Sequence, residues 1–170
     1  MAAATIVISE TNGSGETVTS NISSVNFGSA DSVNLTASAY PITPGNNSFE
    51  KYIRLQISAM GDATQIDNIQ VYAPSASFPV GTGTFLKSNL VTSGYSAATY
   101  AAPVATTSTV ATTNISTTIP GSANIGIASS LTGALTSAGY SDYIVLQIQT
   151  HASDTAGTTI TLRFQWDEVA

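Results

Sequence analysis

The sequence predicts an all-β fold, an antiparallel β-sandwich of jelly-roll-like topology with at most one short helix. Two observations lead to this prediction. The segment Tyr-Ile-x-Leu-Gln-Ile occurs twice, at residues 52–57 and 143–148. Each copy is followed by a polar loop and a second run in which apolar and polar residues alternate, and this period of two is typical of a strand with one buried face. We therefore expect two related β-hairpins whose apolar faces form the core.

The chain before the first copy predicts short strands separated by turns. β-branched residues at 5–9 favour an opening strand. The Asn-Gly-Ser-Gly segment at 12–15 is a turn signal. Extended segments are then expected at 17–19, 25–27 and 33–36.

The first predicted hairpin joins a strand over residues 49–58 to a return strand at 69–72. Alternate residues of the first strand share a mostly apolar face, which we expect in the core: Phe49, Lys51, Ile53, Leu55 and Ile57. Lys51 lies near the entrance of the strand, where we expect its ammonium group to reach water.

Glu50, Lys51 and Arg54 are the densest group of charges in the chain. One interpretation is an ion pair at the sheet edge, worth about 0–1 kcal/mol. The other is a docking contact on a partner subunit. On this second interpretation, the candidate partner-contact residues are Glu50, Lys51, Arg54 and Lys87.

Residues 74–140 form a low-charge insertion rich in Ala, Thr and Ser between the two hairpins, and Lys87 is its one charged residue. β-branched residues among 101–120, including Val104, favour extended segments there. We expect the one short helix at 128–138, where glycines limit its length. An uncharged Thr/Ser surface invites edge-to-edge strand pairing. Burial in an assembly would remove that risk, so we expect the insertion to face a partner.

The second predicted hairpin closes the chain. Ile144, Leu146 and Ile148 alternate along its first strand. Apolar residues of a return strand at 160–166 are expected to face the same core, with the turn at 154–157 between the two strands.

The composition indicates a single domain, residues 1–170, with a nearly uncharged surface. Charged residues make up 8% of the chain and cysteine is absent, against about 25% charged residues in typical soluble domains. The sequence therefore contains no disulfide and no thiol chemistry. Few charges suit a surface that is buried against other protein, because each buried charge needs a partner.

Charge and hydropathy also argue against two classes of partner. The net charge is −6 and the chain has only four Lys and Arg residues. Because phosphate binding needs clustered cations, we expect no nucleic acid. No apolar run approaches the ~18 residues of a membrane helix, so we expect no membrane association. The first residues do not have the pattern of a secretory signal.

Patterns for catalysis and metal binding are weak. His151 is the only histidine, and a Ser-His-Asp triad would need its other members from elsewhere in the chain. One histidine and no cysteine exclude the usual zinc sites. Asp62 and Asp67 are too few for calcium, which takes roughly six to eight oxygen ligands. We therefore expect no enzyme activity, no metal and no cofactor.

Carbohydrate binding is the principal alternative to a structural role, because ligand sites use aromatic walls with a few polar groups. The chain offers seven tyrosines: Tyr40, Tyr52, Tyr72, Tyr95, Tyr100, Tyr140 and Tyr143. Tyr52 and Tyr143 occupy matching positions in the repeat, and Tyr72 and Trp166 end return strands. We expect these aromatic residues to pack in the core or at its rim.

Four segments share the framework of a known group of proteins. They are residues 25–31, 45–54, 141–147 and 164–168. In these segments the chain resembles the small β-rich virion proteins of tailed bacteriophages. Such proteins are commonly capsid decoration, or cement, proteins, and the resemblance brings no catalytic residues with it.

The resemblance implies a structural virion protein, most simply a capsid decoration protein that binds the assembled shell and stabilises it by linkage. Its partners would be the major capsid protein or other virion subunits. It would form a homo-oligomer, and a trimer would match the three-fold positions of a shell. It would be made in the host cytoplasm and then located on the particle surface. The alternative is a glycan-binding or adhesion module of a phage tail or a cell surface.

Overall fold

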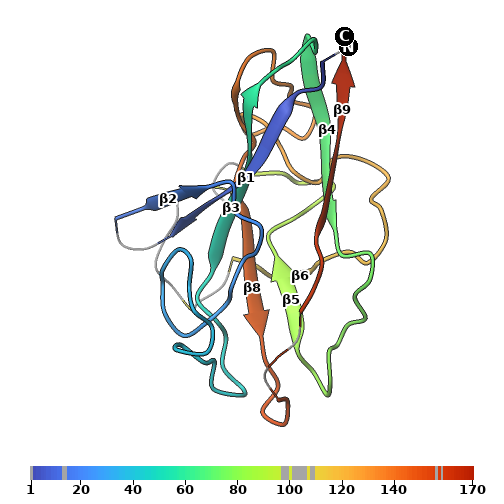
Figure 1. Ribbon diagram of the computed structural model, residues 1–170. Coiled ribbons are helices and arrows are strands. Elements are labelled where there is room, and N and C mark those ends of the chain that lie inside the picture. Colours follow the sequence, from blue (N-terminus) through green and yellow to red (C-terminus); the bar gives the residue numbers. More distant parts are fainter. Residues whose placement is uncertain are drawn as a thin grey trace.

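The computed structural model describes residues 2–12, 15–96, 100, 107, 110–155, 157 and 159–170. These residues form antiparallel sheets with a core between them, which confirms the predicted all-β sandwich (Figure 1). The jelly-roll topology stays a prediction. In chain order the strands are β1 (Thr5–Asn12), β2 (Thr17–Ser20), β3 (Lys51–Ala59), β4 (Gln65–Tyr72), β5 (Phe85–Ser88), β6 (Thr113–Asn114), β7 (Gly139–Tyr140), β8 (Ile144–Gln149) and β9 (Arg163–Val169).

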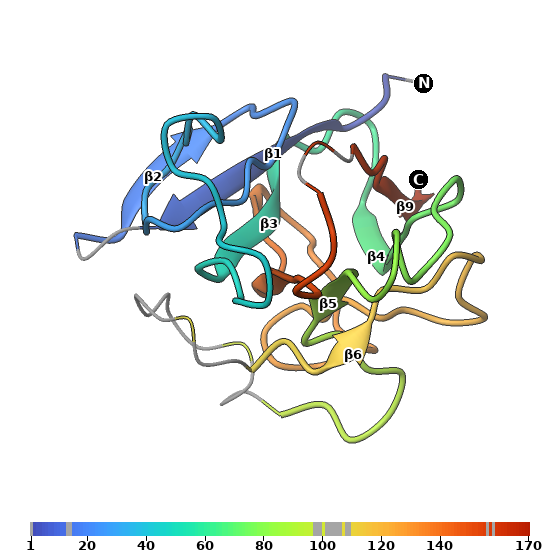
Figure 2. The ribbon, with the colours of Figure 1, turned by 90° about the horizontal axis from the view of Figure 1, so that it is seen from below.

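The larger sheet has the strand order β2-β1-β3-β8-β5-β6, and β7 also pairs with β3. The smaller sheet consists of β4 and β9. Viewed from below, β4 and β9 lie together on the side of the molecule away from β1 and β2 (Figure 2). Both chain ends lie at the same end of the sandwich (Figure 1).

The two copies of the repeat pair with each other. β3 pairs with β8 in the larger sheet. β4 follows β3 and β9 follows β8, and these two strands pair with each other in the smaller sheet. The predicted pair of hairpins is therefore wrong. Ile53 lies opposite Ile144, and these two residues hold the same position in the two copies. A local two-fold axis therefore relates β3 and β8 about this pair.

The alternating pattern could not reveal this arrangement. Period two shows that a strand has one buried face, but it does not show which strand is the neighbour. After β3 the chain crosses the sandwich at 60–64 and enters the other sheet at Gln65. The crossing turns the apolar face of β4 towards the apolar face of β3, so that Ile66 and Ile69 join Ile53 and Ile57 in one buried cluster.

The core lies between the sheets and is entirely aliphatic at its centre. It draws on β3, β4, β5 and β8, and half-buried Phe164 and Trp166 close it from β9. Its buried members are Ile53, Leu55, Ile57, Ile66, Ile69, Val71, Ala73, Leu86, Leu90, Ile115, Ile125, Ile127, Ile144 and Leu146. Burial of a side chain of this size contributes about 1.5–3 kcal/mol, so this cluster is the main source of stability.

The segment between β2 and β3 forms a loop over one end of the sandwich. The strands expected at 25–27 and 33–36 are absent, and turns and bends stand in their place. Leu35 is nonetheless buried, and it packs against the backbone of Gly28 so closely that a side chain at this glycine would collide with it. Burial of single residues, and not sheet pairing, explains the apolar positions in this loop.

The described residues between 74 and 140 are part of the sandwich. They supply β5 inside the larger sheet and line the open edge of β4. The Asn124 side chain mimics a neighbouring strand there: its Oδ1 accepts from Val71 N at 2.9 Å, and its Nδ2 donates to Val71 O at 2.9 Å. The extended segment expected around Val104 lies outside the described residues.

The helix expected at 128–138 is absent. Ala128 and Ser129 have positive φ angles of 50° and 64°, which a right-handed helix does not allow. Leu135 instead forms a two-way backbone bridge with Ile66, with both N–H···O distances at 2.9 Å. Pairing this segment to the edge of β4 satisfies backbone groups that a short, glycine-containing helix would leave exposed.

Candidate partner-binding surface

The four residues predicted as partner contacts fall into two environments. Glu50 and Lys51 are 1% and 0% exposed, so the chain itself encloses them. Arg54 and Lys87 are half-buried, and their surfaces remain open to a partner. Arg54 lies on β3 and Lys87 on β5, and β8 runs between these strands. The structure therefore does not bring the four residues together into one site.

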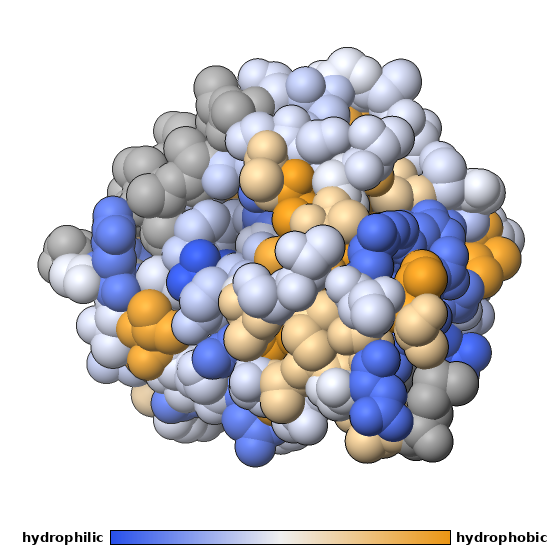
Figure 3. All heavy atoms as spheres, turned by 90° about the horizontal axis from the view of Figure 1, so that it is seen from above, coloured by the Kyte–Doolittle hydropathy of each residue, from blue (hydrophilic) through white to orange (hydrophobic). Residues whose placement is uncertain are grey.

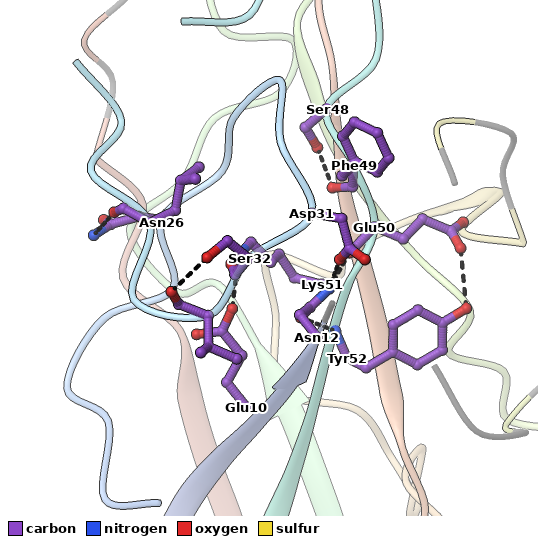
Figure 4. Close-up of polar contacts among 12 residues, drawn as sticks. Glu10, Asn12, Asn26, Asp31, Ser32, Ser48, Phe49, Glu50, Lys51 and Tyr52 are labelled. Atoms are coloured by element: carbon purple, nitrogen blue, oxygen red, sulfur yellow. Dashed lines mark hydrogen bonds and ion pairs between the residues drawn. The ribbon is translucent and has the colours of Figure 1, made fainter. Parts of the chain in front are cut away.

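Lys51 forms a buried ion pair with Glu10, with Nζ and Oε1 2.7 Å apart (Figure 4). Its ammonium group also donates to the carbonyl oxygen of Ser32. The expectation that this group reaches water is wrong, because the loop after β2 folds over the end of the strand. The predicted ion pair with the neighbouring charges is also wrong. Removing one member of such a buried pair is costly, so the pair fixes β1, β3 and the loop in one arrangement.

Glu50 anchors the segment at Val110 and Ala111. Its Oε1 accepts from the backbone N–H groups of Val110 and Ala111, at 2.7 and 3.2 Å, and its Oε2 accepts from Tyr52 Oη at 3.2 Å. Figure 4 shows this carboxylate pointing to the tyrosine and away from Lys51. The sequence carries no local signal for this contact, because the partners are about 60 residues away.

Arg54 points away from the core, on the outer face of the larger sheet. Its guanidinium carbon lies 3.8 Å from the centre of the Tyr140 ring and 4.7 Å from that of Tyr143. Cation–π contacts of this kind are worth about 0.5–2 kcal/mol each. We call these three residues the Arg54 cluster. Arg54 Nε is buried and has no hydrogen-bond partner among the described residues.

Arg54 also has no acidic partner in the described part of the chain. All ten Asp and Glu residues lie in that part, and the ion pair found among its side chains is the one between Lys51 and Glu10. Asp142, which lies close in sequence to the two tyrosines, directs its carboxylate elsewhere. It accepts from Tyr95 Oη at 2.5 Å and from Ser129 N at 2.9 Å.

The position that matches Arg54 in the second copy is Val145, and the chain covers it completely. Val145 is 0% exposed and packs with Tyr52 and Ala111. Tyr52 meets Tyr143 edge to face, with ring centres 6.0 Å apart. The middle segment therefore encloses Val145 completely through Ala111, whereas at Arg54 it contributes the Tyr140 ring and leaves the side chain half-exposed.

Most of the tyrosines serve the structure. Tyr52, Tyr72 and Tyr100 are buried. Tyr95 stacks on Tyr100 with ring centres 4.1 Å apart. The burial of these two rings raises both pKa values, that of Tyr100 to about 12, and for Tyr95 the hydrogen bond to the Asp142 carboxylate adds to the increase.

The exposed tyrosines do not form a joint platform. Tyr40 and Tyr140 are 47% and 39% exposed. Tyr40 belongs to the loop between β2 and β3, whereas Tyr140 belongs to β7 and carries Arg54 on its ring. This outcome agrees with the expectation that most aromatic residues pack in the core or at its rim.

His151 lies in a loop that Asp154 holds in place. The Asp154 carboxylate accepts from Thr82 N at 2.6 Å, Gly83 N at 3.2 Å and Thr84 Oγ1 at 2.6 Å. The Thr84 hydroxyl and the Thr82 N–H are the main reasons that the pKa of Asp154 is lowered to about 2. His151 Nδ1 accepts from Ser153 N at 3.2 Å. The carboxylate thus clamps the loop before β5 to the loop after β8.

The described residues contain neither a cluster of metal-binding side chains nor a membrane-spanning helix. Three or more His, Asp or Glu side chains do not come together there in a way that would hold a metal ion. Within the same residues, no helix has the length and the apolar composition required to cross a membrane.

Comparison with protein-family models, with curated proteins and with solved structures finds no match to this chain.

Proposed function

We propose that this protein is a structural component of a virion, a capsid decoration protein that binds the assembled shell and stabilises it. The observation that carries the proposal is the distribution of charge. From residue 74 to residue 140 the chain has one charged side chain, Lys87, and these residues border both sheets. A surface of hydroxyl, amide and methyl groups costs less to cover with another protein than a charged surface does, provided that its polar groups find hydrogen-bond partners.

Exposed apolar side chains on this surface support the proposal. Val110 and Ile119, both in the uncharged segment, are 43% and 52% exposed. A second apolar area lies outside this segment: at the end of the sandwich that carries both termini, Figure 3 shows hydrophobic and weakly hydrophobic residues near the middle, with strongly hydrophilic residues beside them. Four alanines and one glutamate line a hollow at this end: Ala2, Ala3, Ala63, Ala170 and Glu168.

The role of such a protein would be stabilisation by binding. A chain that binds only the assembled shell lowers the free energy of that state relative to separated subunits, by RT ln(1 + c/Kd) per site, where c is the concentration of free chain. The stiff framework of the chain suits this role, because a preformed surface loses little conformational entropy when it binds. Repeated contacts around a shell would multiply a modest affinity per site.

The direct test is mass spectrometry of purified phage particles. We expect peptides of this chain in the particle, at a fixed ratio to the major capsid protein. Absence of the chain from particles would end the proposal.

A second measurement tests the mechanism. Removing the chain from the particles should lower the temperature at which the shell opens, and adding it back should restore that temperature. An unchanged opening temperature would reject the stabilising role while leaving the chain a particle component.

Glycan binding is a second candidate function, and one observation favours it. Tyr140 is exposed and lies beside a guanidinium group, which is a combination that can stack on a sugar ring and donate to its hydroxyls. A glycan array tests it. Saturable binding that Tyr140→Ala abolishes would support this function over the first.

A further inference from the structure

We propose that Arg54 is the residue through which this protein docks on its partner, and that it does so by binding a carboxylate side chain on the surface of a particle subunit. The inference rests on the proposed function and adds to it a site and a partner chemistry. Three properties of the Arg54 cluster carry it: its geometry, its charge and its place in the repeat.

The guanidinium group of Arg54 is already positioned for binding. Tyr140 and Tyr143 hold it at 3.8 and 4.7 Å from their ring centres. A stacked arginine loses less side-chain entropy on binding than a free one, because fewer of its rotamers remain to be fixed. Arginine and tyrosine are also enriched among the residues that dominate the energy of protein interfaces.

The charge of this group is not neutralised within the described chain. Lys51 has Glu10 as its partner at 2.7 Å, whereas Arg54 has no carboxylate beside it there, although the protein has ten acidic residues and only four cationic ones. A guanidinium group offers a planar pair of donors that matches a carboxylate. Charge complementarity therefore selects an acidic side chain as the occupant.

The repeat shows what an occupied surface looks like in this fold. At the matching position, Val145 is enclosed by Ala111 and by Tyr52, and Glu50 holds the covering segment through the N–H groups of Val110 and Ala111. At Arg54 the middle segment contributes the ring of Tyr140, and the side chain stays half-exposed instead of being enclosed. A partner at Arg54 would occupy the place that the chain's own segment occupies at Val145.

The polar groups around Arg54 favour a protein partner over a sugar. Two of the neighbouring hydroxyl groups are already used inside the sheet. Ser9 Oγ donates to Gln56 Oε1 at 2.9 Å, and Tyr143 Oη donates to Thr11 Oγ1 at 3.4 Å. A sugar needs several converging hydrogen-bond partners. A carboxylate needs only the guanidinium group.

The test measures binding of recombinant chain to phage particles from which the native chain has been removed. The variants are Arg54→Met, which keeps the length of the side chain, and Arg54→Lys, which keeps the charge but not the planar pair of donors. The matched control is Arg163→Met, which removes an exposed cation from β9 in the other sheet. Far-ultraviolet circular dichroism and urea unfolding establish that each variant is folded.

We expect Arg54→Met to raise the Kd at least about tenfold, since a hydrogen bond to a charged group contributes that much. The Kd of Arg54→Lys should lie between that of the unmodified chain and that of Arg54→Met. The Kd of Arg163→Met should equal that of the unmodified chain. Rising salt should weaken the unmodified chain more than Arg54→Met.

Three results would overturn the inference, and they differ in what else they reject. If the unmodified chain does not bind particles, the proposed function fails together with the inference. If the chain binds and Arg54→Met binds equally well, the inference alone fails. If the chain binds a glycan array and Arg54→Met abolishes that binding, the surface belongs to a saccharide and not to a protein carboxylate.

Discussion

The two copies of the repeat form matching strands at the centre of the larger sheet, and they differ wherever they leave the core. Ile53 and Ile144 face each other on the local two-fold axis and are equally buried. One position further along, Arg54 is half-exposed and Val145 is enclosed. The residues that the two copies share form the core, and the residues that differ between them match the different surroundings of each strand.

The residues directly before the two copies, Lys51 and Asp142, also have different surroundings. Lys51 begins β3 and is neutralised by Glu10, deep under a loop. Asp142, its counterpart before β8, accepts from Tyr95 and Ser129 and so holds the segment before β8. Each copy thus uses its lead charge to tie down a different loop.

The largest expected effect comes from the first of these lead charges. Lys51→Met leaves Glu10 buried without its partner, and we expect it to lower the free energy of unfolding by about 3–5 kcal/mol. Urea unfolding measures the loss. The double variant Glu10→Gln with Lys51→Met should recover most of it, because neither charge then remains buried. A loss below about 1 kcal/mol in the single variant would contradict the buried pair.

A smaller loss is expected from the second lead charge. Asp142→Ala removes the acceptor for Tyr95 Oη and Ser129 N, and hydrogen bonds to a charged group contribute about 1.5–3 kcal/mol. Urea unfolding again gives the value. Tyr95→Phe should reproduce part of the loss, and equal stability of Asp142→Ala and the unmodified chain would show that this carboxylate does not hold the segment.

The shared core position should give equal effects in the two copies. Ile53→Val and Ile144→Val should each cost about 0.5–1.5 kcal/mol. Because the residues face each other, the double variant should depart from the sum of the single ones. Ile119→Val is the exposed control, with no expected change. Strictly additive and unequal costs would argue against the two-fold arrangement.

The smallest effect concerns the loops that follow the two copies. The loop after β3 is short, whereas the loop after β8 is clamped by Asp154, whose pKa is lowered from 3.8 to about 2. A lowered pKa stabilises the fold above the unfolded value of about 3.8, and that contribution is lost as the pH falls towards 2. Asp154→Asn should therefore lower the Tm at neutral pH and show a flatter decline of Tm between pH 4 and pH 2. If the Tm of Asp154→Asn and that of the unmodified chain fall equally between pH 4 and pH 2, the Asp154 carboxylate does not stabilise these loops.

The fold class followed from the sequence because alternation and β-branched residues act locally. Strands at β1, β2, β3, β4, β8 and β9 were predicted at or near their observed positions. The pairing was not predictable, because β3 and its return strand belong to different sheets, and no residue at 60–64 distinguishes a crossing from a hairpin. The helix at 128–138 failed for a related reason: the open edge of β4 offered Leu135 a backbone partner.

The candidate site was predicted in part. Arg54 was identified as a charge on the outward face, and this placement is correct. Glu50 and Lys51 were also candidate contacts, and the ammonium group of Lys51 was expected in water, yet both residues are enclosed by segments from distant parts of the chain. The two tyrosines around Arg54 lie about 90 residues away in the sequence and come from β7 and the start of β8. The antiparallel pairing of β7 and β8 with β3 brings them together.

Imaging of phage particles at near-atomic resolution is the most direct test of the central claim, that the chain binds a shell through the Arg54 cluster. We expect the two-sheet fold on the outside of the shell, with Arg54 against an acidic side chain of a capsid subunit. Particles without this fold, or a bound chain whose Arg54 cluster faces solvent, would contradict the account.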